Sequence, residues 1–157
     1  MKKNQRSLDQ TDLQILALLY DDASLNNKDI ADKVGLAPSS CLERLKRLQT
    51  DKVILKHRLL VDVNALGGHI QAMISVRLSD HNRATVDQFQ QDLLPLAEVM
   101  SIYHMGGEND FLVHVTVSDS MHLRDFVFNA ITARKEVNHV ETALLYDHHV
   151  SATLPSF

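Results

Sequence analysis

The chain has 157 residues, a formal net charge of −4 and 45% apolar residues, enough for one domain or two small ones. It contains no apolar run near the roughly 20 residues that cross a bilayer, and its first residues lack the apolar stretch of a signal peptide. We therefore expect a soluble cytoplasmic protein without membrane contact. Its single cysteine, Cys41, excludes an internal disulfide.

The charge is divided unevenly along the chain. Residues 1–62 contain 11 Lys and Arg against 9 Asp and Glu, whereas residues 63–157 contain 5 against 11. Only the first part therefore has a charge balance that tolerates a polyanion such as DNA.

Helical periodicity dominates the first 50 residues. We predict a helix over residues 8–20, where Asp9 and Asp12 have the spacing of a capping box. A shorter helix over 28–34 is expected to stop at Gly35. These two elements precede a third helical segment.

That third helix is predicted over residues 38–50, with a proline at its first position, after a turn of only a few residues. Two helices joined so tightly are typical of the helix-turn-helix, whose second helix enters the major groove. The spacing turns Cys41, Leu42, Leu45 and Leu48 toward the core and the polar side chains outward. A solvated basic face is the alternative interpretation. We predict double-stranded DNA as a partner, with contacts from Lys28, Pro38, Ser39, Ser40, Glu43, Arg44 and Arg47.

Beyond the third helix the pattern changes. Residues 53–63 are rich in β-branched residues and leucine, which predicts a strand or hairpin, either a wing or a connecting strand. Turn residues at 64–68 mark a boundary, so we predict domains at 1–61 and 62–157.

The second domain is predicted to have the order βαββαβ, a ferredoxin-like arrangement, which makes the whole chain α+β. Its sheet is expected to expose an apolar face that drives self-association. The expected elements are a strand at 68–79, a helix at 83–94, strands at 99–105 and 111–117, a helix capped by Asp119 or Ser120, and a strand at 137–147. The candidates for the exposed apolar face are Met73, Met100, Ile102, Leu112 and Leu145.

Three stretches occur together in order: LDQTDLQILALL, IADKVGLAPSSCLERLKRL and HMGGENDFLV. With them the chain resembles the leucine-responsive and asparagine-responsive (Lrp/AsnC) regulators from Leu8 to about His148. The resemblance implies a winged helix-turn-helix and a βαββαβ effector domain that dimerises through its sheet, with dimers often assembling further. It also implies an amino acid or related metabolite as effector. Ala37 stands where the family usually has a capping serine, and Asn109 replaces a usual aromatic residue.

The loop at 106–110 is the candidate effector site, formed by Gly106, Gly107, Glu108 and Asp110. Glycines let backbone N–H groups approach a ligand carboxylate, and the Asp110 carboxylate can meet an α-ammonium group. The alternative is that the loop is only a β-turn.

We therefore predict a ligand-responsive transcriptional regulator that is not an enzyme and needs no cofactor. Two other functions share this domain order: a tetrapyrrole (sirohaem-type) decarboxylase, and an architectural DNA-binding protein without an effector. Histidines in or beside the strands, His104, His114, His148 and His149, have the spacing of no metal motif, and we expect no metal site.

Overall fold

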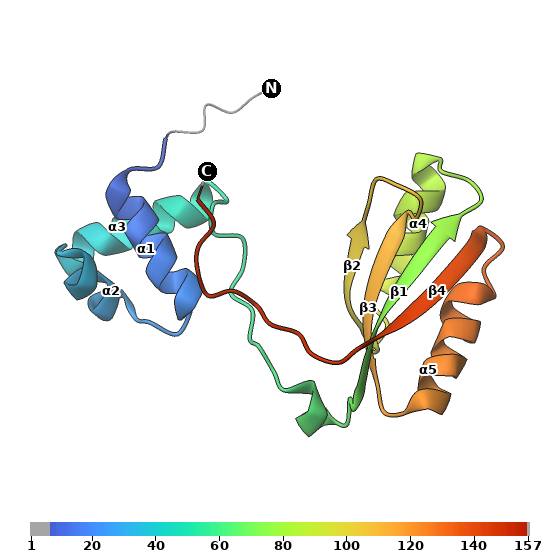
Figure 1. The fold of residues 1–157 in the computed structure, drawn as a ribbon. Coiled ribbons are helices and arrows are strands. Elements are labelled where there is room, and N and C mark those ends of the chain that lie inside the picture. Colours follow the sequence, from blue (N-terminus) through green and yellow to red (C-terminus); the bar gives the residue numbers. More distant parts are fainter. Residues whose placement is uncertain (1–6, 157) are drawn as a thin grey trace. The chain divides into compact units, whose positions relative to one another are not determined.

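The computed structural model describes residues 7–156 and divides the chain into two compact units (Figure 1). One unit ends at Leu60 and also includes the residues from His149 onward, and the other spans Val61–His148. The predicted domain limits also covered residues 1–6 and 157, which lie outside the described residues. The last segment of the chain thus groups with the N-terminal unit rather than with the sheet domain in which the sequence prediction placed it.

The N-terminal unit has the three predicted helices: α1 (Gln10–Asp21), α2 (Asn27–Val34) and α3 (Pro38–Thr50). Asp9 caps α1 in the expected capping box with Asp12, and α2 ends at Gly35 in the left-handed conformation, with φ of 70°. No side chain caps α3, because Ala37 precedes it. The core consists of Ile15, Ile30, Ala31, Cys41 and Leu48.

The expected strand or hairpin over residues 53–63 is wrong for the single chain. From Leu55 to Asp62 the structure has neither helix nor strand, and a 3₁₀ turn, η1 (Val63–Leu66), follows. The apolar side chains that suggested a strand are open to solvent, with Leu55, Leu59 and Leu60 exposed by 80%, 87% and 82%. A strand also needs a neighbouring backbone to pair its N–H and C=O groups, and β propensity alone does not supply one.

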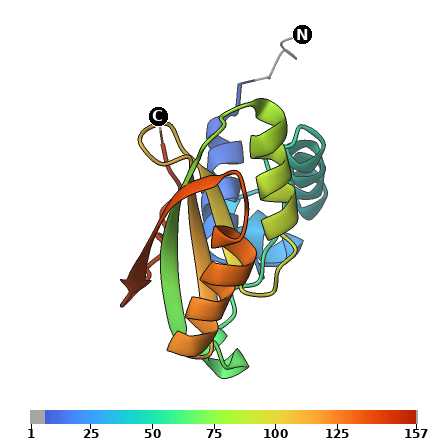
Figure 2. The same cartoon turned by 90° about the vertical axis from the view of Figure 1, so that its right-hand side faces the viewer.

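The second unit confirms the predicted βαββαβ order. Its elements are β1 (Ile70–Leu78), α4 (Arg83–Leu93), β2 (Val99–His104), β3 (Phe111–Val117), α5 (Ser120–Phe126), the π-helical turn η2 (Val127–Thr132) and β4 (Val137–Leu145). The four strands are antiparallel in the order β2-β3-β1-β4. Figure 2 shows α4 and α5 on the same side of this sheet.

Alternate side chains of the central strands form the core beneath these helices. Ala72, Ile74, Val76 and Leu78 of β1 are buried, and the rings of Phe89 from α4 and Phe111 from β3 stack with centroids 4.7 Å apart. The other face of the sheet is not covered by these helices.

One residue expected on that uncovered face belongs to the core instead. Ile102 is paired with the buried Val113 and packs against the core cluster. A register shift between Val99 and Ser101 moves the alternation of β2, which the sequence pattern did not reveal. Met73 and Leu112 are partly buried and alternate with core residues, as expected for that face.

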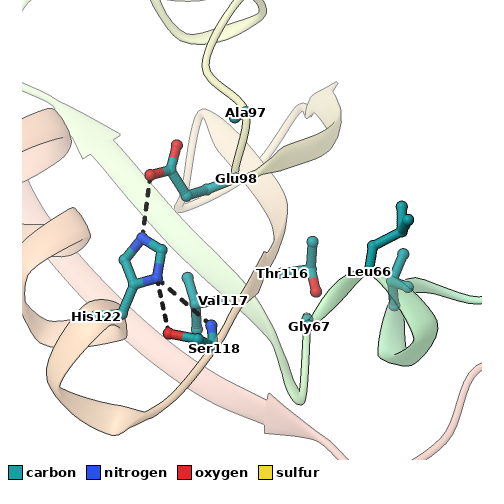
Figure 3. A pocket seen from close by; sticks show the side chains of 10 residues that line it. Leu66, Gly67, Ala97, Glu98, Thr116, Val117, Ser118 and His122 are labelled. Atoms are coloured by element: carbon teal, nitrogen blue, oxygen red, sulfur yellow. Dashed lines mark hydrogen bonds and ion pairs between the residues drawn. The ribbon is translucent and has the colours of Figure 1, made fainter.

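A pocket of about 340 Å³ lies where η1 meets the end of β3 and the start of α5 (Figure 3). Val63, Leu66 and Gly67 line one part of it, and Ser118 and His122 line another. Among the described residues, no helix is long and apolar enough to cross a membrane.

Candidate DNA-binding helix and effector loop

The turn between α2 and α3 has the tight geometry of a helix-turn-helix. Gly35 closes α2 in the left-handed region, and after two intervening residues α3 begins at Pro38. The Asn27 side chain donates a hydrogen bond to the Pro38 carbonyl oxygen over 2.8 Å. This bond ties the start of α2 to the start of α3 and fixes the approach of the two helices.

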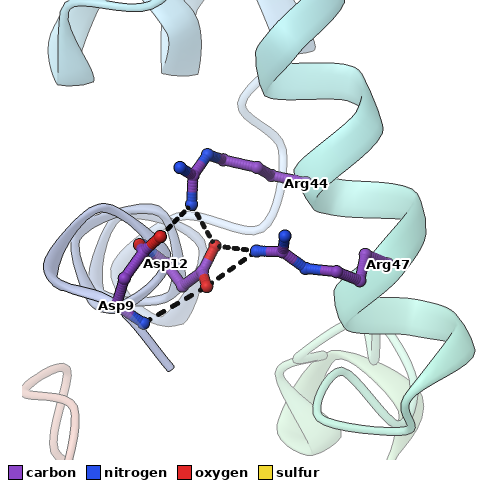
Figure 4. Close-up of polar contacts among 4 residues, drawn as sticks. All are labelled: Asp9, Asp12, Arg44 and Arg47. Atoms are coloured by element: carbon purple, nitrogen blue, oxygen red, sulfur yellow. Dashed lines mark hydrogen bonds and ion pairs between the residues drawn. The ribbon is translucent and has the colours of Figure 1, made fainter. Parts of the chain in front are cut away.

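A buried carboxylate in α1 holds α3 from the other side (Figure 4). The Asp12 side chain is only 3% exposed. Arg47 donates to both Asp12 oxygens over 2.7 and 2.8 Å, and Arg44 donates to one of them over 2.8 Å. Arg44 also donates to Asp9 over 2.6 Å. A carboxylate shared by two guanidinium groups therefore joins α1 to α3.

The charges reinforce one another in this cluster. Hydrogen bonds to Asp9 and then Asp12 raise the pKa of Arg44, and the bond from Arg44 lowers the pKa of Asp9. Burial raises the pKa of the Cys41 thiol, with an opposing influence from Arg44. Cys41 is thus a small buried hydrophobe, as its place in the core indicates.

The predicted orientation of α3 is wrong at three positions. Arg44 and Arg47 do not face outward but lie against α1, with side chains 26% and 35% exposed. Leu42, expected in the core, is 42% exposed. The helix is turned so that the guanidinium groups of both arginines reach Asp12. DNA contact by these arginines remains a prediction.

The outward face of α3 presents small, acidic, basic and apolar side chains together. Ser39, Ser40, Glu43 and Lys46 are exposed there, beside Leu42. The other two predicted DNA-contacting residues, Lys28 and Pro38, are also exposed, at the starts of α2 and α3. Leu42 and Lys46 were missing from the predicted set. The signal that could have revealed the arginine contacts is Asp12, an acidic residue within the apolar stripe of α1, because a buried carboxylate needs a cationic partner.

The loop between β2 and β3 has the predicted glycines but a different use for its acid. Gly107 has φ of 140°, a conformation that favours glycine. The Asp110 carboxylate accepts the Leu78 backbone N–H over 2.7 Å and lies 2.7 Å from His81 Nδ1. It therefore anchors the loop to the end of β1, while the other expected site residues, Gly106 and Glu108, are exposed.

Two polar atoms near this loop lack hydrogen-bond partners within the described residues. Arg77 Nε and Asn109 Oδ1 are buried without a partner, and an Arg77 guanidinium nitrogen lies 3.5 Å from Glu108 Oε1. Unpaired buried donors and acceptors are costly, so they mark places where a ligand or second chain can bind. Arg77 was missed because an arginine in a strand has no motif of its own.

The histidines form no metal centre among residues 7–156, since no three His, Cys, Asp or Glu side chains there are placed to hold an ion. His114 is 5% exposed, and its Nε2 lies 2.9 Å from Gln71 Oε1. Its ring also meets that of His148 edge-on, and the His104 ring stacks on Phe111.

Comparison with family models supports the two units separately. Residues 8–54 match a winged helix-turn-helix DNA-binding model, and residues 71–155 match the Lrp/AsnC ligand-binding domain. The helix-turn-helix and the βαββαβ sheet therefore define a transcriptional regulator with a DNA-binding part and a small-molecule-binding part.

Similar proteins agree with this class. The chain is 38% identical to the HTH-type transcriptional regulator AldR of Mycolicibacterium smegmatis, over 91% of this chain and 84% of the relative. It is 32% identical to the transcriptional regulator AzlB of Bacillus subtilis, over 88% of each. A transcriptional regulator of Neisseria meningitidis, solved with L-methionine, superposes with a TM-score of 0.86 at 25% identity, covering 95% of this chain and 97% of that one. The protein belongs to the Lrp/AsnC family.

Proposed function

We propose that the protein reads DNA with the outward face of α3, and that Asp12 sets the orientation of that face. The observation that carries this proposal is the clamp of Arg44 and Arg47 on Asp12, which leaves Glu43 and Lys46 facing outward. Lysine neutralises phosphate, and a glutamate can accept from the cytosine amino group. Leu42 offers an apolar contact for a thymine methyl group.

The N-terminal end of α3 contributes phosphate contacts in this proposal. Its first backbone N–H groups and the Ser39 and Ser40 hydroxyls suit an anion. Lys28 and Pro38 flank that end. The N–H groups of Arg44 and Arg47 that do not bind Asp12 remain able to reach a phosphate, so both residues keep a place in the proposed interface.

Affinity for a duplex selected by the protein itself tests this interface. Lys46→Ala should reduce the affinity about tenfold or more at moderate salt and lower the salt slope by about one. Lys135→Ala removes the same charge from an exposed position in the other unit and serves as the matched control. Equal affinities of Lys46→Ala and Lys135→Ala would show that the outward face of α3 does not contact DNA.

We further propose that an amino acid is the effector and binds beside the 106–110 loop. Arg77 suits the carboxylate of such a ligand, and Glu108 and the Asn109 side-chain oxygen suit its ammonium group. The Neisseria relative was solved with L-methionine, which supports an amino acid as the class. Self-association into dimers or larger assemblies would let the effector alter how several DNA sites are held.

A thermal-shift screen of the amino acids tests the effector proposal, because a ligand of the folded state raises the melting temperature. Arg77→Gln should abolish the shift that a hit produces, while Arg83→Gln, an exposed arginine nearby in sequence, should keep it. Absence of any stabilising amino acid would favour the architectural alternative. We propose a cytoplasmic regulator rather than an enzyme, since the named relatives are transcriptional regulators.

A further inference from the structure

The pocket at the start of α5 lies far along the sheet from the effector loop. The loop precedes β3 at Phe111, whereas the pocket surrounds the other end of that strand at Val117 and Ser118. Its volume of about 340 Å³ falls within the range of small-ligand sites. We propose that this pocket is a second binding site, which takes a small aliphatic amine in its ammonium form.

Glu98 supplies the acceptor for the ammonium group. Its Oε1 lies 3.1 Å from His122 Nε2, and Figure 3 shows the imidazole between Glu98 and Ser118. On the other side of the ring, Nδ1 accepts the Ser118 backbone N–H over 3.4 Å. With Nδ1 as acceptor, the neutral ring donates from Nε2 to Glu98. The imidazole thus orients the carboxylate, which keeps further lone pairs for a ligand.

The hydrogen-bonded series of Glu98, His122 and Ser118 does not make the Ser118 hydroxyl a nucleophile. Its oxygen lies 2.9 Å from Asp119 Oδ2 and 3.2 Å from His122 Nδ1. The hydroxyl has one proton, and it donates that proton in a hydrogen bond to the nearer Asp119 carboxylate rather than to His122. Hydrogen bonds from the His122 backbone N–H and from the Ser118 hydroxyl lower the pKa of Asp119, which keeps this carboxylate charged. The arrangement is therefore suited to binding rather than to acyl transfer.

The charge of the pocket selects the sign of the ligand. Among the described residues that line the pocket, Glu98 is the only one with a permanent charge, and none is a lysine or arginine. The hydrogen bond with His122 lowers the pKa of Glu98, so this carboxylate is ionised near neutral pH. An ammonium group gains a charge-assisted hydrogen bond here, whereas a carboxylate is repelled.

The remaining walls select an organic cation. Val63, Leu66 and Val117 present apolar surface to the same space. Within the described part of the chain no cluster of His, Cys, Asp and Glu is placed to hold a metal ion. A compact amine with an aliphatic tail satisfies both the carboxylate and the apolar wall.

The floor of the pocket is closely packed. A side chain on Gly68 would overlap the Thr116 side-chain oxygen and approach the Val63 carbonyl oxygen to 3.1 Å. That Thr116 oxygen is buried and has no hydrogen-bond partner in the part of the chain that the structure describes. The glycine therefore lets η1 lie directly against β3, which builds the pocket before any ligand arrives.

Titration calorimetry of the full chain with 3-methylbutylamine tests the proposal, with 4-methylpentanoate as a ligand of similar shape and opposite charge. We expect saturable binding of the amine and none of the acid. Glu98→Gln keeps the shape of the side chain and should weaken amine binding about tenfold or more. Ala97→Leu fills the pocket from an exposed position without changing its charge, and should also abolish binding. Glu108→Gln, in the effector loop, should bind the amine as the parent does.

Nuclear magnetic resonance of the ¹⁵N-labelled chain locates the site independently. Amine addition should shift the amides of Gly68, Glu98 and Ser118 and leave those of residues 106–110 unchanged. The proposal is overturned by absence of saturable amine binding, by equal binding of the acid, by parental affinity in Glu98→Gln, or by shifts confined to the effector loop. The first three outcomes do not bear on whether an amino acid binds at that loop, and the fourth would locate a ligand there while removing the second site, so the two proposals fail separately.

Discussion

Removing the Asp12 carboxylate is the sharpest perturbation of the DNA-binding unit. In Asp12→Ala, Arg47 loses both of its hydrogen bonds to that side chain, and Arg44 keeps only Asp9. The charged ends of both arginines lose the group that directs them inward. We expect α3 to be held less firmly against α1.

The size of the effect follows from exposure. Breaking a fully buried ion pair by removing one partner costs about 3–5 kcal/mol. Arg44 and Arg47 are 26% and 35% exposed, so water rehydrates them in part. We therefore expect the free energy of unfolding of the N-terminal unit to fall by about 2–3 kcal/mol in Asp12→Ala. Asp12→Asn keeps the shape and one acceptor oxygen, and should lie between this variant and the parent.

Hydrogen–deuterium exchange of the full chain measures this loss unit by unit. Exchange should accelerate in peptides from α1 and α3, while peptides from β1 and β3 remain as in the parent. Asp32→Ala is the matched control, because it removes an exposed helical aspartate from the same unit, and should change stability by no more than about 0.5 kcal/mol. If Asp12→Ala and Asp32→Ala exchange alike, the carboxylate does not hold α3.

Three further predictions concern the sheet domain. Asp110→Ala removes the acceptor for the Leu78 N–H and should destabilise this unit to urea by about 1–3 kcal/mol, whereas Glu108→Ala, at an exposed position of the same loop, should stay within about 0.5 kcal/mol. Gly107→Val strains the backbone at φ of 140° and should abolish the amino-acid response without changing basal DNA affinity; a parental response would show that the loop does not sense ligand. Burial, and secondarily His148, lowers the pKa of His114. The unfolded chain therefore takes up this proton first, and stability should fall as pH drops below about 6.5, with a smaller slope in His114→Gln; an unchanged slope in urea denaturation would exclude His114 as the cause.

The elements were largely predictable because their periods and caps are local. The Asp9 and Asp12 capping box, the left-handed Gly35 and the alternation of β1 each depend on residues close in sequence. The register shift in β2 depends on its pairing with β3, which is why the place of Ile102 was missed. Apolar residues at 53–63 predicted a strand, but residues 7–156 of the single chain offer that backbone no strand to pair with.

The orientation of side chains was less predictable than the helices that bear them. A pattern that counts arginine as polar turns Arg44 and Arg47 outward, whereas a buried aspartate on another helix turns them inward. Similarly, the sequence suggested that the Asp110 carboxylate binds a ligand, whereas in the structure it accepts the backbone N–H of Leu78 at the end of β1. Both misplacements arise because the partners lie 32 to 35 residues away along the chain.

In vitro selection from a random duplex library tests the central claim most directly, since it makes no assumption about the operator sequence. The full chain should enrich a defined sequence and bind it at least about a thousandfold more tightly than non-specific DNA at physiological salt. Lys46→Ala should lose affinity for that sequence, and Lys135→Ala should retain it. Recovery of unenriched DNA, or of an enriched sequence that both variants bind as the parent does, would contradict DNA reading by the outward face of α3.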